Sequence, residues 1–194
     1  MRVLIFLILF LLADCSFSGE PKVKFVNLSN QKLSAIPDSI YTMDKLEYLD
    51  LGNGFTIYPP LSALSPDELS GESMNQITQI SENISQLKQL KVLNVCANDL
   101  RSLPNGLVQL RMLDTLDISH NKHLQLANEL ETLSKMTWLK YLNIIGTNAD
   151  PESVDKIKKS LHTTKIIASL DEVIDSTMMD SLINSVILLQ PEIK

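Results

Sequence analysis

Residues 90–110 read LKVLNVCANDLRSLPNGLVQL, a phrase with leucine or valine at regular places and an asparagine, Asn98, between Val95 and Leu100. The phrase restarts at Leu113, with Asn121 in the place of Asn98. Asn75, Asn98 and Asn121 stand 23 residues apart. A fixed period of this length indicates a stack of similar units that presents an extended surface.

Each position in the phrase has a physical role. Leu93 and Val95 lie two apart, so on a short strand both side chains point to one face and form the core. We expect Asn98 to turn inward, where its amide can hydrogen-bond backbone groups of adjacent turns. The apolar residues that follow predict a 3₁₀ or short helical segment on the back of each unit, and they are Leu103, Leu107 and Leu110 in one unit and Ile80, Ile84 and Leu87 in the unit before.

The pattern L-x-x-L-x-L-x-x-N-x-L-x-x-L-P resembles the leucine-rich repeat family. The resemblance implies an α/β solenoid shaped like a horseshoe, with short parallel strands on the concave face, 3₁₀ or short helices on the convex face and C-terminal capping helices. Units open at Val23, Leu46, Leu90, Leu113 and Leu139. Because the interval from Leu46 to Leu90 is long enough for two units, we expect six repeats over roughly residues 21–150, with Gln31 and Thr147 replacing the asparagine in the end units.

The segment 55–73 departs from the pattern. In register with Asn75, its core strand positions would be Asp67, Ser70 and Glu72, which cannot form a buried face. Pro59, Pro60, Pro66 and Gly71 also favour turns. We expect an irregular insert at 55–73, either a protruding recognition loop or a decayed repeat that still stacks, with the ladder of asparagines resuming at Asn75.

The N-terminus predicts export. Ten apolar residues, 3–12, follow Arg2, which suits a signal peptide over residues 1–14 and is too short to span a bilayer. Leu12-Ala13-Asp14-Cys15 resembles a bacterial lipobox, although Asp14 departs from the small residue usual there. The resemblance implies lipidation of Cys15, a linker at 15–20, and a bacterial cell-envelope protein anchored to the outer membrane by lipid. The alternative is cleavage after Ser18 and a secreted protein.

Residues 151–194 are expected to form a C-terminal cap and an amphipathic tail. Asp150 and Pro151 are typical of a helix start, and Val154, Ile157 and Leu161 share one helical face. Residues 165–168 could add a last strand. In the tail, apolar residues from Leu170 to Leu189 recur every three or four positions, which predicts either a capping helix or a helix for self-association.

The sequence offers no catalytic, metal or cofactor site. His120 and His123 lie beside Asn121 without a third ligand at metal spacing, and no phosphate loop or nucleophile elbow is present. The formal net charge of −6 argues against nucleic acid as a partner. A non-enzymatic protein that binds another protein or a glycan fits best; the alternative is a structural envelope protein that self-associates through its tail helix.

The outward-facing strand positions form the candidate binding surface, in two columns across the sheet. We name these the aromatic column (Phe25, Tyr48, Val92, Thr115 and Tyr141) and the polar column (Asn27, Asp50, Asn94, Asp117 and Asn143). Tyrosine and phenylalanine beside asparagine and aspartate are common in contact surfaces. The alternative is that the polar column only links neighbouring strands.

Overall fold

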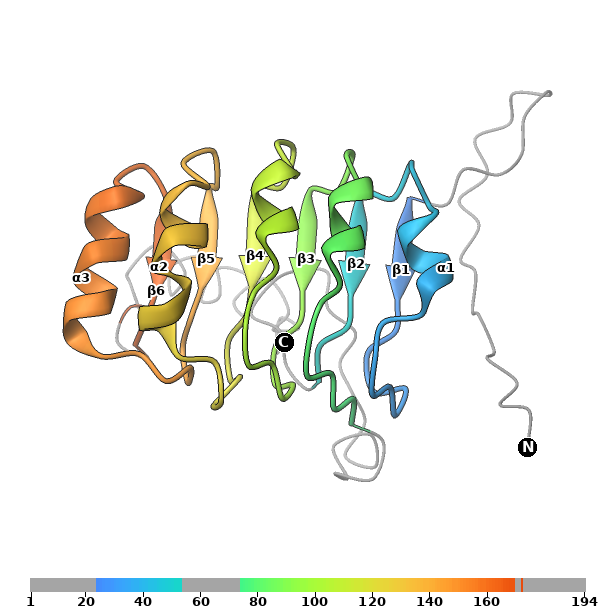
Figure 1. The fold of residues 1–194 in the computed structure, drawn as a ribbon, viewed down its shortest axis with the longest axis horizontal. Coiled ribbons are helices and arrows are strands. Elements are labelled where there is room, and N and C mark those ends of the chain that lie inside the picture. The colour runs from blue at the N-terminus through green and yellow to red at the C-terminus, as the bar shows by residue number, and fades with distance from the viewer. Residues whose placement is uncertain (1–23, 54–73, 170–171, 173–194) are drawn as a thin grey trace, which may run out of the picture.

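The molecule is built around one parallel sheet whose strands follow each other in sequence order (Figure 1). The structure is a computed structural model that describes residues 24–53, 74–169 and 172. The strands are β1 (Phe25–Asn27), β2 (Tyr48–Asp50), β3 (Val92–Asn94), β4 (Thr115–Asp117), β5 (Tyr141–Asn143) and β6 (Lys165–Ile167). Each strand therefore contacts mainly the units before and after it, as expected of a repeat solenoid.

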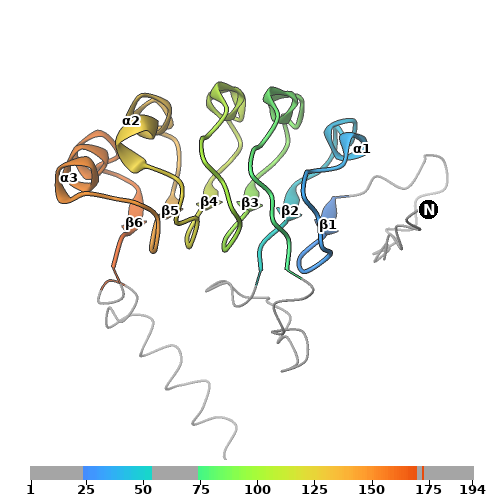
Figure 2. The same cartoon turned by 60° about the horizontal axis from the view of Figure 1, so that its bottom comes forward.

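Helical segments cover the other side of the sheet. They are α1 (Asp38–Tyr41), η1 (Glu82–Gln86), η2 (Asn105–Gln109), α2 (Leu126–Ser134) and α3 (Pro151–Ser160), of which η1 and η2 are 3₁₀ helices. Figure 2 shows the strands along the inner side of a curved stack and the helices along its outer side. The predicted α/β solenoid is confirmed, whereas the longer helix α2 was not predicted.

The core consists of the leucines that the pattern placed inside. Leu46, Leu90 and Leu113, which precede their strands, are fully buried, and Leu139 is almost so. The strand leucines and the helical leucines meet them in one continuous cluster. Continuity matters because no single unit can bury an apolar face by itself.

The ladder asparagines point inward, as predicted. Asn98 Nδ2 donates to the carbonyls of Leu51, Val95 and Cys96 at 2.9, 3.3 and 3.2 Å, while its Oδ1 accepts from Ile77 N at 3.0 Å. Asn121 repeats the arrangement one unit later, accepting from Leu100 N. These buried amides satisfy backbone groups that the strand ladder does not reach.

The interval between Leu46 and Leu90 holds one unit and not two. β2 pairs directly with β3, Tyr48 beside Val92, so no strand of a further repeat lies between them. Asn75 instead completes the unit of β2, because its Nδ2 donates to the carbonyls of Leu28 and Leu51 at 2.8 and 3.0 Å. The ladder does resume at Asn75. Residues 54–73 lie outside the described residues.

A left-handed residue precedes the ladder position in the regular units. Ala97 and His120 have φ of 53° and 56°, Asn30 precedes Gln31 with 53°, and Gly146 precedes Thr147 with 68°. A Cβ on Gly146 would lie 2.6 Å from His120 Nδ1. This turn therefore needs both an unusual φ and close stacking on its neighbour.

The C-terminal cap follows the sequence prediction. Asp150 caps α3, its Oδ1 accepting from Ser153 N at 2.9 Å, and Pro151 occupies the first turn. Ile157 in α3 and Leu161, the residue that follows the helix, are buried, and β6 adds the expected last strand. The predicted signal peptide, Cys15, and all of the predicted tail helix except Glu172 lie outside the described residues.

Candidate binding surface

The aromatic column is aligned across the sheet as predicted. Successive strands pair Phe25 with Tyr48, Tyr48 with Val92, Val92 with Thr115, and Thr115 with Tyr141. The alignment follows from the buried leucines, because a slip by one residue would turn every leucine outward. Lys165 extends the column on β6.

Phe25 and Tyr48 form a stacked pair at the N-terminal end of the column. Their ring centroids lie 4.5 Å apart with an interplanar angle of 21°. Phe25 is 46% exposed, while Tyr48 is half-buried. Burial raises the pKa of Tyr48 to about 12, with Asp50 adding to the shift, so its hydroxyl stays neutral. Rigid, partly exposed rings supply contact area at low entropic cost.

The polar column lies deeper in the surface than the sequence suggested. Asp50, Asn94, Asp117 and Asn143 are all buried, and only Asn27 is exposed. Asn94 Nδ2 donates to Asp50 Oδ1 at 2.7 Å, and Asn143 Nδ2 donates to Asp117 Oδ2 at 3.0 Å. These bonds join neighbouring strands, which was the alternative for this column; contact with a ligand stays a prediction.

The same side chains also fold the chain after each strand. In all five units the side-chain oxygen accepts from the backbone N–H two residues later; the acceptors are Asn27, Asp50, Asn94, Asp117 and Asn143. Such a bond closes a turn locally. The polar column is therefore a structural element of every unit.

Burial shapes the charge of the polar column. It raises the pKa of Asp50 to about 6, against the opposing hydrogen bonds from Gly52 and Asn94. Burial likewise raises the pKa of Asp117, against bonds from Ser119 and Asn143. The thiol of Cys96 beside them also has a raised pKa, again mainly through burial, so it is a poor nucleophile.

A row of charged residues borders the aromatic column. It was not recognised from the sequence. Each member immediately precedes a strand, and the signs alternate along the row: Lys24, Glu47, Lys91, Asp114 and Lys140. Glu47 pairs with Lys24 at 3.2 Å and with Lys91, and Asp114 pairs with Lys140 at 3.2 Å. Alternation of sign at the same place in successive units was the signal that could have revealed it.

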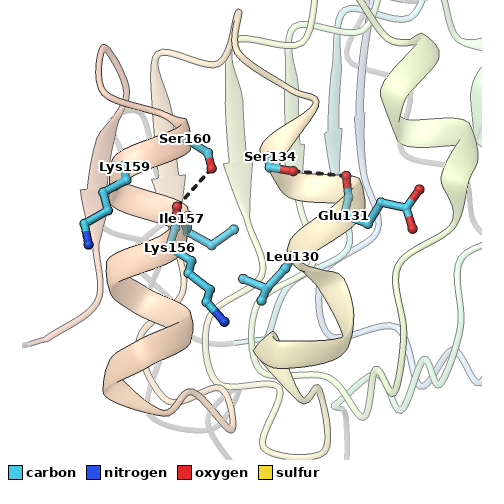
Figure 3. Close-up of a pocket in the computed structure, with 7 residues that line it drawn as sticks. All are labelled: Leu130, Glu131, Ser134, Lys156, Ile157, Lys159 and Ser160. Atoms are coloured by element: carbon cyan, nitrogen blue, oxygen red, sulfur yellow. Dashed lines mark hydrogen bonds between the residues drawn. The ribbon is translucent and has the colours of Figure 1, made fainter.

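A groove between α2 and α3 lies on the opposite, helical side (Figure 3). Its lining includes Leu130 and Ile157, and its hydroxyls are turned to their own helices: Ser134 Oγ donates to the Glu131 carbonyl and Ser160 Oγ to the Lys156 carbonyl. Lys156 pairs with Glu152. The groove thus presents helix packing and internally paired polar groups, and we assign it no ligand.

Other kinds of site find no support in the described part of the chain. No group of three histidine, cysteine, aspartate or glutamate side chains is placed there to hold a metal ion. Among these residues there is also no helix long and apolar enough to cross a membrane.

The repeated strand, inward asparagine and outer helical segment together decide the architecture. The fold is a leucine-rich repeat solenoid. No protein-family profile matches the chain. Among curated proteins, it is similar to adenylate cyclase of Schizosaccharomyces pombe, with 35% identity over 133 residues, which is 66% of this chain and 8% of that protein.

Two further curated proteins are similar over shorter stretches. The PHLPP-like protein phosphatase of Drosophila melanogaster is 42% identical over 38% of this chain and 7% of its own length. Human leucine-rich repeat-containing protein 66 is 35% identical over 55% of this chain and 12% of its own length. The chain therefore spans about a tenth of the length of the curated proteins it matches.

Two solved structures of bacterial proteins are also similar. A Leptospira interrogans leucine-rich repeat protein has a TM-score of 0.36 at 22% identity, covering 74% of this chain and 48% of that one. An internalin from Listeria monocytogenes has a TM-score of 0.44 at 21% identity, covering 74% and 46%.

Proposed function

We propose that this protein is a non-catalytic protein-binding module whose partner docks on the concave sheet. The observation that carries the proposal is the stacked Phe25–Tyr48 pair, which leaves a large apolar ring 46% exposed on the sheet. An exposed ring held rigid by a neighbour is suited to act as an anchor for a partner.

The distribution of polar groups supports the aromatic column as the main contact. The polar column is buried and hydrogen-bonded within the chain, so a partner that displaced those bonds would gain little net free energy. The aromatic column carries Tyr141 at its other end, half-buried and aligned with Thr115. A protein partner can span such a column more readily than a small ligand, because the column is an open row across successive strands.

A pair of matched variants tests the proposal. The purified chain would be used to capture partners from envelope extracts, and the captured protein identified and titrated. Phe25→Ala and Tyr48→Ala should each weaken that complex by roughly 1 kcal/mol or more, with an unchanged melting temperature.

Met112→Ala is the matched control, since Met112 is the other large apolar side chain that the described residues expose, at 49%. It lies in the turn before β4 and not on the sheet. If Met112→Ala weakens the complex and the two ring variants bind like wild type, the concave sheet is not the binding surface.

We also propose that the module is held at the bacterial cell envelope, at the outer membrane, through lipid on Cys15. The support is the apolar run that ends at Leu12 and the cysteine three residues beyond it. Metabolic labelling with a palmitate analogue should mark the wild type and leave Cys15→Ser unmarked. An unlabelled wild type released into the medium would replace this proposal with secretion.

A further inference from the structure

The charged row beside the aromatic column suggests the chemistry of the partner. Its signs alternate across Lys24, Glu47, Lys91, Asp114 and Lys140, so the row contains ion pairs between neighbouring strands. Exposed pairs of this kind contribute little to stability. Fold stability therefore does not by itself account for five charged residues at equivalent places.

Exposure divides the row by sign. The side chains of Lys24, Lys91 and Lys140 are 68%, 46% and 78% exposed, whereas those of Glu47 and Asp114 are 26% and 34% exposed. The lysine side chains are thus more exposed than the carboxylates that pair with them, and they offer more of their surface to a partner.

Lys165 continues this positive border. It is exposed, occupies the β6 place in the aromatic column beside Tyr141, and makes no ion pair with another described residue. The chain as a whole has a net charge of −6. A border of four outward lysines is therefore a local feature that the overall composition does not explain.

Charge and apolar contact coincide at the N-terminal end of the sheet. Lys24 directly precedes Phe25 on β1, and Lys91 directly precedes Val92 on β3. The stacked rings are Phe25 on β1 and Tyr48 on β2, the strand that lies between β1 and β3. Glu47 lies between Lys24 and Lys91 and pairs with both, so the positive charges are separated, which does not suit a continuous phosphate backbone. Separated carboxylates next to a ring match the pattern better.

We propose that the partner is an acidic polypeptide that places an aromatic side chain on the Phe25–Tyr48 stack and carboxylates against Lys24 and Lys91. The inference rests on the proposed function, namely that the concave sheet binds a protein.

The probe is a fluorescent random copolymer of glutamate and tyrosine, titrated with the purified full chain. We expect saturable binding, tighter than to polyglutamate, that weakens as salt rises. Binding that is equal for polyglutamate, or as tight for a lysine–tyrosine copolymer or a single-stranded oligothymidine, overturns the inference.

Matched charge reversals locate the contact. Lys24→Glu with Lys91→Glu should weaken copolymer binding about tenfold. Lys135→Glu with Lys156→Glu is the control, because these lysines are similarly exposed, are each paired with a glutamate one helical turn away, and lie on α2's end and α3. The net charge change is the same, so an equal loss in both variants would show a non-specific effect and overturn the inference.

Two additions keep the outcome readable. Lys24→Gln with Lys91→Gln avoids placing a new glutamate beside Glu47, and it should still weaken binding if the variants with glutamate fail to fold. If Tyr48→Ala weakens a captured partner while the lysine variants and the copolymer show no effect, the concave function stands and the acidic partner is rejected. If Tyr48→Ala leaves that partner unaffected, the proposed function itself fails.

Discussion

The units of β2 and β3 each contain an inward ladder asparagine, Asn75 and Asn98. In the unit of β3 the asparagine follows its strand closely in the sequence, whereas in the unit of β2 a long insertion separates the two. In the unit of β3, Ala97 is followed directly by Asn98. In the unit of β2, the equivalent residue is Asn53, because Asn53 N donates to the Cys96 carbonyl as Ala97 N donates to that of Ser119. Its ladder partner is Asn75, 22 positions further on.

The side chain of Asn53 links the two ends of the insertion. Asn53 Oδ1 accepts from Asn75 N at 2.7 Å, and Asn53 Nδ2 donates to the carbonyls of Asn75 and Ala97 at 2.8 and 2.7 Å. The Asn53 carboxamide thus ties the backbone of Asn75 to that of Ala97 across the insertion. A repeat of this solenoid can therefore hold a long insertion when both ends of the insertion are tied to the asparagine ladder.

The largest effect is expected on removing a ladder asparagine. Asn75→Ala leaves Gln31 N, Leu33 N and the Leu28 carbonyl without a partner. Asn98→Ala leaves Ile77 N without one and removes one of two hydrogen bonds from three carbonyls. We expect a loss of about 2–3 kcal/mol in the free energy of unfolding for each variant. Chemical denaturation would measure it. An unchanged midpoint for Asn98→Ala would contradict its inward placement, whereas a much smaller loss for Asn75→Ala alone would show that the split unit depends on other contacts.

A smaller and more local effect is expected from Asn53→Ala. The substitution leaves Asn75 N and two carbonyls unpaired, and we expect a loss of about 2 kcal/mol. Hydrogen exchange should speed up at the amide of Asn75, with Leu100 N, which donates to Asn121, as the internal reference.

Asn53→Asp separates the two halves of the bridge. It keeps an acceptor for Asn75 N and removes the donor to both carbonyls. The protection of Asn75 N from hydrogen exchange should therefore lie between that of the wild type and that of Asn53→Ala. Equal protection of Asn75 N in all three proteins would show that the carboxamide does not tie the insertion.

The contrast between these units also shows what the sequence could and could not reveal. The strand registers were predictable because Leu49, Leu93 and Leu116 can point only inward, and the structure pairs them as expected. The number of units was predicted wrongly because a 44-residue interval looks like two units. The hydrogen bonds of Asn75 to Asn53, Leu28 and Leu51 show that the extra residues enter between β2 and the ladder asparagine of its own unit.

The depth of the polar column was likewise beyond a reading of the sequence. Alternation predicts that Asp50 and Asn94 face away from the core, and they do lie on that side. It does not predict that the side chains lie along the sheet, bonded to each other and to the next turn, where neighbouring units bury them.

A pH-dependent effect is expected where the polar column crosses from β2 to β3. Asn94 donates to Asp50 there, and burial raises the pKa of Asp50 from 3.8 to about 6. The folded chain therefore takes up this proton more readily than the unfolded chain, and stability from this group is lost as pH rises from about 4 to about 6.

Asp50→Asn should remove that loss. Its Oδ1 can still accept from Gly52 N and Asn94, and its new amide can donate to Asn27, as Asn94 does to Asp50. We expect a gain of roughly 1–2 kcal/mol at neutral pH that disappears below about pH 4. Unfolding curves at both pH values would measure it; a gain of equal size at both would assign the effect to packing rather than to ionisation.

The smallest effect is expected from glycine substitutions at the two equivalent residues, Ala97 and Asn53, whose backbone conformations differ. Ala97 adopts φ of 53°, whereas Asn53, which is not followed directly by its ladder residue, is not among the residues with positive φ. Ala97→Gly relieves the strain of a Cβ in the left-handed region, which costs roughly 1–2 kcal/mol, but also increases the freedom of the unfolded chain. The net gain should be about 0.5–1 kcal/mol. Asn53→Gly should instead destabilise, since it gains no relief and loses the bridge to Asn75. Thermal unfolding of both variants gives the comparison directly, and a stabilised Asn53→Gly would mean that its side chain is dispensable and that the split unit is closed by the backbone alone.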